Sequence, residues 1–372
     1  MTRCRSAPRS GSIDHPRARE LTGLRLTSVS DPALAGYDDI IDVRSPSEFA
    51  DDHIPGAINL PVLDDQQRAE VGTIYRQVSP FDARKLGGAL VAANAAKHIA
   101  GRLSDRDGGW RPLVYCWRGG QRSGAFSTIL RQIGWRADLV EGGYKSWRRL
   151  VVATVQDMPI ASPAVVLDGN TGSAKTAVLV RLAARGVQVV DLEGLANHRG
   201  SLFGGMPGGQ PAQRLFESRL ACAIAALDPA RPVVFEAESS RIGDIVLPKA
   251  IWQAICAAPR IRLAVPVRER AAYTARFYGE ATGDAAQIVS RLRPLHPADR
   301  IDGWLALARA GDWAALAEGL MQHHYDPRYD KHRARYSARE RAVLQADRLD
   351  DAGIDTLAAQ VQDALPAIIA EP

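Results

Sequence analysis

Residues 114–123 read VYCWRGGQRS, and this stretch decides the fold of the first half of the chain. An apolar run at residues 113–116 ends at a cysteine, a Gly-Gly pair follows, and the residues after it have helical spacing. Similar β-branched runs at residues 39–43 and 137–140 alternate with helical stretches at residues 82–102 and 123–133. Strands that alternate with helices predict a parallel sheet covered by helices, so we expect an α/β domain over residues 26–155.

The loop after the apolar run predicts a reactive thiol at Cys116. Loop amides and a helix N-terminus create positive potential that favours thiolate, and Arg122 supplies a planar cation for an oxyanion. The predicted anion cradle comprises Trp117, Arg118, Gly119, Gly120, Gln121, Arg122 and Ser123. A buried, inert cysteine at a strand end is the alternative. That description suits Cys222 and Cys256 better, since both lie in apolar helical stretches.

Two further motifs accompany this loop. Residues 42–49 (DVRSPSEF) are followed by residues 53–61 (HIPGAINLP), and residues 141–144 (EGGY) are followed by Trp147. In this order, and over about residues 26–150, the three motifs strongly resemble those of rhodanese domains. The resemblance implies a small parallel-sheet domain whose Cys116 forms a persulfide or perselenide.

The loop spacing leaves a competing function open. Common sulfurtransferase loops have one residue fewer between Cys and Arg, and Cys-x5-Arg-Ser is also the spacing of Cys-dependent phosphatases. The usual phosphatase His is replaced here by Tyr115, and the loop holds no obvious general-acid Asp. A loop of this size suits a phosphate, and equally a selenophosphate or thiophosphate.

The second half of the chain shows the same strand–loop–helix pattern, and its first loop is a predicted phosphate-binding loop. Residues 164–167 read as a buried strand, residues 175–184 as a helix, and residues 187–190, 232–235 and 262–265 as further strands. The loop between the first strand and helix comprises Gly169, Asn170, Thr171, Gly172, Ser173, Ala174, Lys175 and Thr176. Its backbone N–H groups would surround a phosphate that Lys175 neutralises. P-loops have Gly where Ala174 stands, so a positive φ there would cost Ala about 1 kcal/mol.

Polar residues follow two other predicted strands of this half. They are Glu193, His198 and Arg199 after one strand, and Glu236, Glu238, Ser239 and Arg241 after another. A pair of carboxylates there could bind Mg²⁺ or act as general base, although a capped strand-to-helix turn explains them equally well. His198 alone is more typical of a structural or surface histidine, but beside Arg199 it lies in a plausible substrate loop.

Composition sets the limits of the whole chain. A length of 372 residues with 46% hydrophobic residues predicts two globular domains, and four scattered cysteines fit a reducing compartment. No apolar run reaches the roughly 18 residues that span a bilayer, so we expect a cytoplasmic protein without membrane contact. The first 25 residues hold six arginines and two acids, which accounts for most of the net charge of +5. We expect these to form a disordered tail, residues 156–163 a linker, and residues 164–372 a P-loop α/β domain that is mostly helical after about residue 284.

A basic–aromatic stretch is the predicted RNA-binding face. Its candidate residues are Tyr325, Arg328, Tyr329, Lys331, Arg333 and Arg335. Cations bind the phosphate backbone and tyrosines stack on splayed bases. A solvated helix face with internal ion pairs explains the same residues nearly as well.

The chain as a whole resembles the bacterial tRNA 2-selenouridine synthase family. Beyond the two loops, the matching segments are residues 72–77 (GTIYRQ), 191–201 (DLEGLANHRGS), 236–243 (EAESSRIG) and 324–329 (HYDPRY). The family replaces the sulfur of wobble 2-thiouridine in tRNA with selenium from selenophosphate, and an S-geranyl-2-thiouridine intermediate is made from geranyl diphosphate. The resemblance implies that Cys116 handles selenium and that the P-loop holds a diphosphate. It implies no tightly bound cofactor and no structural metal, and it is compatible with Mg²⁺.

Overall fold

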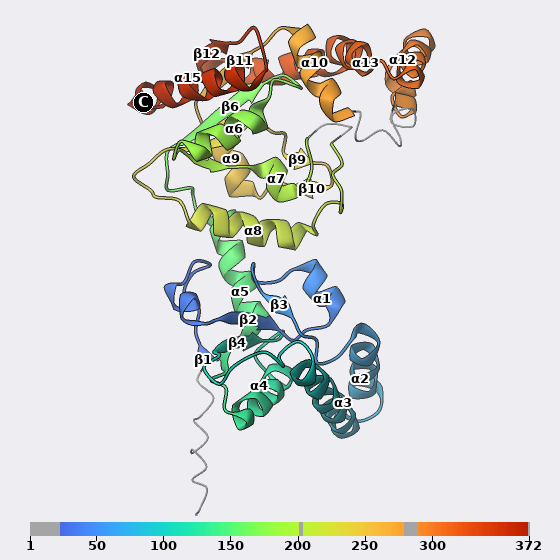
Figure 1. The fold of residues 1–372 in the computed structure, drawn as a ribbon, viewed down its shortest axis with the longest axis vertical. Coiled ribbons are helices and arrows are strands. Elements are labelled where there is room, and N and C mark those ends of the chain that lie inside the picture. Colours follow the sequence, from blue (N-terminus) through green and yellow to red (C-terminus); the bar gives the residue numbers. More distant parts are fainter. Residues whose placement is uncertain (1–22, 201–203, 279–288, 371–372) are drawn as a thin grey trace, which may run out of the picture. The chain divides into compact units, whose positions relative to one another are not determined.

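The computed structural model describes residues 23–200, 204–278 and 289–370 (Figure 1). Contacts divide the chain into two compact units. The first comprises residues 23–26 with Pro32–Pro46 and Gly56–Lys145, and the second comprises Thr27–Asp31, Ser47–Pro55 and the residues from Ser146 onward. The predicted tail therefore lies almost wholly outside the described residues.

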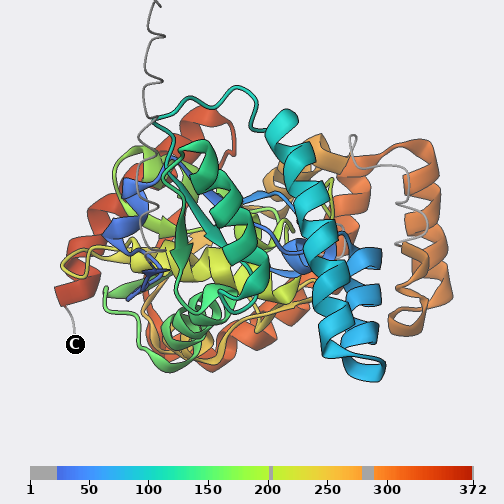
Figure 2. The ribbon, with the colours of Figure 1, turned by 90° about the horizontal axis from the view of Figure 1, so that it is seen from below.

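The first unit is built on a five-stranded parallel sheet with the strand order β1-β5-β4-β2-β3. The strands are β1 (Gly23–Leu24), β2 (Asp39–Asp42), β3 (Ile58–Asn59), β4 (Pro112–Tyr115) and β5 (Asp138–Val140). The helices are α2 (Asp65–Gln77), α3 (Pro80–Ala100) and α4 (Gln121–Ile133), and α2 and α3 lie side by side in Figures 1 and 2. Helices α1 (Pro46–Asp51) and α5 (Gly143–Val152) each contain residues that are assigned to both units.

Local sequence explains where these helices begin and end. The side chain of Asp64 caps α2 and forms a capping box with Gln67, while Ser79 caps α3 and Pro80 occupies its first turn. Helix α4 ends at Gly134, whose φ of 115° few other residues adopt. Beneath these helices the core packs Ile41, Val114 and Phe126 from strands and helix against one another.

The second unit contains a five-stranded parallel sheet with the order β12-β11-β6-β8-β7. Its strands are β6 (Ala164–Gly169), β7 (Gln188–Val190), β8 (Val233–Glu236), β11 (Arg260–Ala264) and β12 (Glu340–Gln345), and a small hairpin adds β9 (Arg241–Ile242) and β10 (Ile245–Val246). The helices are α6 (Lys175–Ala184), α7 (Leu192–Ala196), α8 (Gln213–Ala225), α9 (Lys249–Ala257), α10 (Val267–Tyr278), α12 (Ala298–Ala310), α13 (Trp313–Leu320), α14 (Asp326–Arg333) and α15 (Asp351–Ala370).

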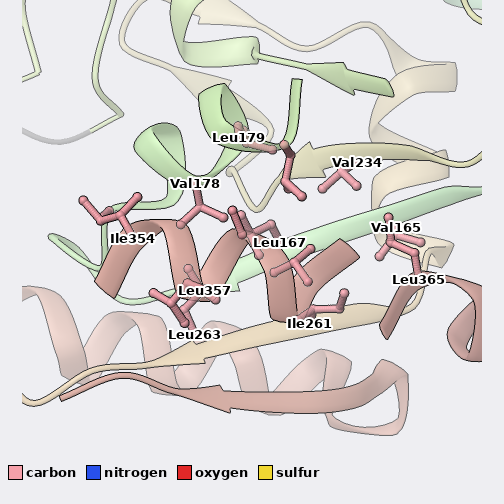
Figure 3. Packing of buried hydrophobic residues seen from close by; sticks show 14 of the residues in the cluster. Val165, Leu167, Val178, Leu179, Val234, Ile261, Leu263, Ile354, Leu357 and Leu365 are labelled. Atoms are coloured by element: carbon pink, nitrogen blue, oxygen red, sulfur yellow. The ribbon is translucent and has the colours of Figure 1, made fainter. Parts of the chain in front are cut away.

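A continuous apolar core holds α6 and α15 against the sheet. Figure 3 shows Leu167 and Ile261 from neighbouring strands facing Val178 of α6 and Leu357 of α15, and all four side chains are fully buried. The chain from β6 into α6 is therefore fixed by packing, and this is the segment that carries the predicted phosphate loop.

The expected α/β class is confirmed. One strand, β12, lies within the region that we expected to be mostly helical, and it pairs in parallel with β11 at the sheet edge. Its side chains alternate between half-buried and exposed. Three of its six residues are charged or carry an amide, so the run does not show the apolar pattern of a buried strand. Residues 146–155, assigned to the first domain from sequence, make their contacts in the second unit, where Trp147 Nε1 donates to Ser218 Oγ over 3.2 Å.

Candidate functional site

The thiol loop lies where β4 meets α4. Cys116 follows the last residue of the strand, and Gly119 has a φ of 69°, which curls the loop back toward the helix. The loop rests on the start of α5, because Tyr144 N–H donates to Cys116 O over 2.8 Å and Lys145 N–H donates to Trp117 O over 3.0 Å. The loop and the EGGY motif are thus one hydrogen-bonded structure.

Gly143 allows this close approach. Its φ is 58°, and a Cβ atom there would lie 2.4 Å from both Cys116 O and Gly119 N. Real Cβ atoms essentially never approach another heavy atom to less than 3.0 Å, so no other residue fits without displacing the loop backbone. Sequence reasoning did not assign this role to Gly143, although the Gly-Gly pair in the motif was a usable signal.

Electrostatics at the loop favour thiolate. Cys116 is only 4% exposed, and burial alone would raise the pKa of its thiol. The hydrogen bond from Ser123 Oγ to Cys116 Sγ, at 3.2 Å, acts in the opposite direction together with backbone N–H groups of Ser123 and Gly120 and the charge of Arg122. The net result is a pKa of Cys116 below the ordinary thiol value. By contrast, burial raises the pKa of Cys222 to about 11.

The DVRSPSEF motif supports the site from beneath. Arg44 is 1% exposed and donates from Nε and Nη2 to the carboxylate of Asp42, which is fully buried. The guanidinium also lies 4.0 Å from the ring centroid of Tyr144, whose ring in turn lies 5.2 Å from that of Trp117. The motif is therefore a scaffold that fixes Tyr144 beneath the thiol loop.

The predicted phosphate loop runs from the end of β6 to the first residue of α6. Lys175 Nζ donates to Gly169 O over 2.9 Å, which keeps the ammonium group folded over the loop. A Cβ at Gly172, whose φ is 80°, would clash with Thr274 Oγ1 and Arg270 O. Ala174 has a φ of 60°, so the strain anticipated for this alanine is present. In the described part of the chain, Asn197 is the only other non-glycine residue with positive φ.

Three carboxylates from two strand ends gather beside this loop. Thr176 Oγ1 donates to Glu193 Oε2 over 2.9 Å, and Glu193 N–H donates to Glu236 Oε1 over 2.5 Å. Burial and the neighbouring acids raise the pKa of Glu236 well above its ordinary value. Burial and Glu193 raise the pKa of Glu238 to about 8. The predicted acids of both strands are therefore brought together, and their proximity contributes to the raised pKa of Glu236 and of Glu238.

A cavity of about 410 Å³, here called the P-loop pocket, opens over the loop. Its lining combines polar side chains such as Lys175, Thr176 and Glu193 with apolar ones, here called the apolar wall, which are Ala177, Val180, Met206 and Tyr273. The predicted substrate-loop residues His198 and Arg199 also line it. Ser239 and Arg241 lie outside it and are exposed, Ser239 Oγ bonding to the backbone of Arg241.

The basic–aromatic stretch is divided by the fold. Tyr325 is 7% exposed in the helical core, which does not fit a stacking role. Tyr329 lies against the phosphate loop with its ring centroid 5.7 Å from Lys175 Nζ, and Arg333 bonds to Asn170. Arg328, Lys331 and Arg335 are exposed, as an RNA-contacting face requires.

Arg270 connects this stretch to the phosphate loop, and sequence reasoning missed it. The side chain is 5% exposed and donates to Thr171 O over 3.0 Å and to both carboxylate oxygens of Asp326, at 3.0 and 2.7 Å. The pair fixes the start of α14 beside the loop. The sequence around Arg270 gives no indication that it pairs with Asp326, which lies 56 residues away.

Comparisons with known proteins identify the family. The family model of the rhodanese-like domain matches residues 29–150, and that of the tRNA 2-selenouridine synthase AAA domain matches residues 162–292. A tRNA 2-selenouridine synthase of Hahella chejuensis is 32% identical over 329 residues, which cover 78% of this chain and 84% of that protein. The chain belongs to the tRNA 2-selenouridine synthase family. The resemblance found in the sequence is thereby confirmed.

Other relatives align over a smaller part of their length. The tRNA 2-selenouridine synthase of Aeromonas salmonicida is 38% identical over 252 residues, which cover 66% of this chain and 67% of that protein. Among solved structures, shikimate kinase from Bacteroides thetaiotaomicron matches 55% of this chain and 98% of its own, with 13% identity and a TM-score of 0.27. No helix within the described residues is long and apolar enough to cross a membrane.

Proposed function

We propose that the chain converts 2-thiouridine at the wobble position of tRNA to 2-selenouridine through an S-geranyl-2-thiouridine intermediate. Membership of the tRNA 2-selenouridine synthase family supports selenouridine formation in tRNA. The use of geranyl diphosphate and selenophosphate is supported by the two loops. The observation that carries the proposal is the P-loop pocket, which joins a phosphate cradle to an apolar wall.

The P-loop pocket suits a diphosphate with an apolar tail. Lys175 and the loop amides provide positive charge at one end, where a diphosphate can bind. Val180, Met206 and Tyr273 provide a surface on which a branched hydrocarbon chain can be buried. Geranyl diphosphate matches both ends of the pocket.

Alkylation of the base needs no redox partner. The sulfur of 2-thiouridine attacks C1 of the geranyl group, the C–O bond breaks, and diphosphate leaves with the electron pair. The N3 proton of the base is released, so the product is a neutral S-alkyl nucleoside. Lys175 and the loop amides stabilise the negative charge that develops on the leaving diphosphate. Alkylation also converts a thiocarbonyl sulfur into a thiolate leaving group for the next step.

The selenium step assigns a chemical role to Cys116. Selenium in selenophosphate is already at the selenide level, so its storage as a selenosulfide on the thiol would require an oxidant. Attack of the Cys116 thiolate on phosphorus requires none: an S–P bond forms, the P–Se bond breaks, and selenide is released. Selenide then adds at C2 of the alkylated base, geranylthiolate leaves and takes up a proton, and water hydrolyses the phosphocysteine. The lowered pKa of Cys116 supports the first of these steps.

The acid cluster is compatible with Mg²⁺ bound together with the diphosphate. Thr176 and Glu193 offer oxygen donors next to the phosphate loop, and Glu236 Oε2 is buried without a hydrogen-bond partner. Across residues 23–200, 204–278 and 289–370, no three His, Cys, Asp or Glu side chains are arranged to hold a metal. An ion here would therefore take most of its ligands from the diphosphate and water, and it would neutralise the leaving group's charge.

Binding measurements on the full chain test the alkyl-donor assignment. We expect geranyl diphosphate to bind more tightly than inorganic diphosphate and to be displaced poorly by ATP, as followed by calorimetry. Binding of ATP with no measurable binding of geranyl diphosphate would contradict the assignment. A chromogenic phosphate ester tests the phosphatase alternative: turnover that Cys116→Ser abolishes, together with no 2-selenouridine formed by the unaltered chain, would favour a phosphatase.

A further inference from the structure

We propose that a second cavity of the P-loop domain, here called the aromatic pocket, receives the target nucleotide of the RNA substrate. The inference rests on the proposed function and names the place where the acceptor base binds. The cavity has a volume of about 550 Å³, within the range of small-molecule binding sites. His198, His324, Tyr325, Tyr329, Arg291 and Arg328 contribute to its lining.

The chemistry of this lining is suited to a nucleotide. The partly exposed rings of His198 and Tyr329 offer surfaces for stacking a base, and arginines bind the phosphates on either side of it. The same six residues offer no extended aliphatic wall, in contrast to the P-loop pocket. Arg328 is exposed at the first turns of α14, where a phosphate can reach its guanidinium from solvent.

The pocket is preorganised by buried polar contacts. His324 is 3% exposed, and its Nδ1 lies 2.9 Å from His296 Nε2, so the ring is held in one orientation. His296 packs edge-on against Trp304, with ring centroids 5.0 Å apart. Burial, Arg328 and His296 together lower the pKa of His324 to about 4, so the ring is neutral at pH 7. Arg291 and Arg328 therefore supply the positive charge of this lining.

The two cavities share a wall, and this adjacency gives the aromatic pocket its role. His198 and Tyr329 line both the P-loop pocket and the aromatic pocket. Tyr329 is hydrogen-bonded to Thr171 of the phosphate loop, and Gly243, with a φ of 57°, brings the backbone close to His198. A base in one cavity and an alkyl diphosphate in the other would meet at these two side chains. The sulfur of the base would then face the carbon that it attacks.

Photo-crosslinking of the full chain tests the placement directly. The probe is a synthetic anticodon hairpin that carries 4-thiouridine at the wobble position. After irradiation and proteolysis, we expect the cross-linked peptide to contain His198 or residues 324–329. A cross-link confined to residues 116–123, or to the outer surface of the domain, would overturn the proposal.

A matched pair of arginine variants tests the energetic role of the pocket. We expect Arg328→Ala to weaken binding of a 2-thiouridine hairpin about tenfold and to leave the affinity for geranyl diphosphate unchanged. Arg309→Ala removes an exposed cation of α12 that does not line the pocket, and we expect a change of less than about twofold. Equal weakening by both variants would overturn the proposal.

Product formation separates this inference from the proposed function. The unaltered chain is assayed on the same 2-thiouridine hairpin for S-geranyl-2-thiouridine. If the product forms while the cross-link maps elsewhere, the pocket assignment is wrong and the proposed function stands. If no product forms, the proposed function fails, and the pocket assignment fails with it.

Discussion

Substitution of Gly143 by alanine would test whether the EGGY motif shapes the thiol loop. The new Cβ would lie 2.4 Å from Cys116 O and Gly119 N, about 1 Å inside ordinary contact, and both atoms belong to the backbone. Relief requires the whole loop to move. The left-handed conformation costs alanine about 1 kcal/mol, and overpacking against rigid backbone adds about 2 kcal/mol. We therefore expect the first unit to lose about 3 kcal/mol of unfolding free energy.

Gly56→Ala is the matched control. Gly56 also has a positive φ, 85°, but a Cβ there meets nothing within 4 Å. This variant should show the conformational cost alone, about 1 kcal/mol. Urea-dependent hydrogen exchange of β4 and α4 peptides, read by mass spectrometry, reports the stability of the first unit separately from the second.

Thiol titration adds a second readout for Gly143→Ala. The hydrogen bonds that lower the pKa of Cys116 depend on the position of the loop, so its displacement should move the midpoint of iodoacetamide alkylation to higher pH. Gly56→Ala should leave that midpoint unchanged. If the two variants behave alike in both exchange and alkylation, the close contact does not shape the thiol loop and the reasoning is refuted.

Three further predictions concern single side chains. Ser123→Ala removes the hydrogen bond to Cys116 Sγ and should raise the pH midpoint of alkylation of this thiol. Ser127→Ala is the control, because Ser127 lies on the same helix and its buried Oγ has no hydrogen-bond partner. Equal shifts of the midpoint in the two variants would contradict the role of the hydrogen bond. Val180→Asp should weaken binding of geranyl diphosphate about tenfold, as measured by calorimetry, and should weaken binding of inorganic diphosphate much less. Val246 is also about half exposed but lies outside the P-loop pocket, so Val246→Asp should change the binding of neither ligand. Because the folded pKa of Glu236 is raised, its stabilising contribution is present below about pH 4.5 and is lost as pH rises through the folded pKa. Glu236→Gln should therefore raise Tm at pH 8 and change it little at pH 4.5; an equal effect at both pH values would contradict the raised pKa.

The fold was largely accessible from sequence because its strands are buried on both faces. Continuous apolar runs such as residues 164–167 and 232–235 predicted β6 and β8, and both are confirmed within two residues. The edge strand β12 was not predicted from the sequence, because only half of its side chains face the core. An alternating pattern between charged residues is hard to separate from an exposed helix.

The candidate site could be predicted from the sequence only where its functional residues lie close together in the chain. The loops at Cys116 and Lys175 each lie between a strand and a helix, so their residue spacing already predicted the geometry. Tyr329 and Arg270 reach the phosphate loop from segments about 100 or more residues away, and their roles depend on tertiary packing. The burial of Tyr325 likewise follows from the helical core around it.

The central claim divides the reaction between Lys175, which serves alkyl transfer, and Cys116, which serves selenium delivery. Mass spectrometry of nucleosides from treated tRNA tests it most directly, with 2-thiouridine tRNA and S-geranyl-2-thiouridine tRNA as separate substrates. The unaltered chain should form 2-selenouridine from both when geranyl diphosphate and selenophosphate are present. Lys175→Ala should form it only from the geranylated tRNA, and Cys116→Ser should stop at S-geranyl-2-thiouridine. Absence of 2-selenouridine with the unaltered chain, or equal loss of both steps in both variants, would contradict the account.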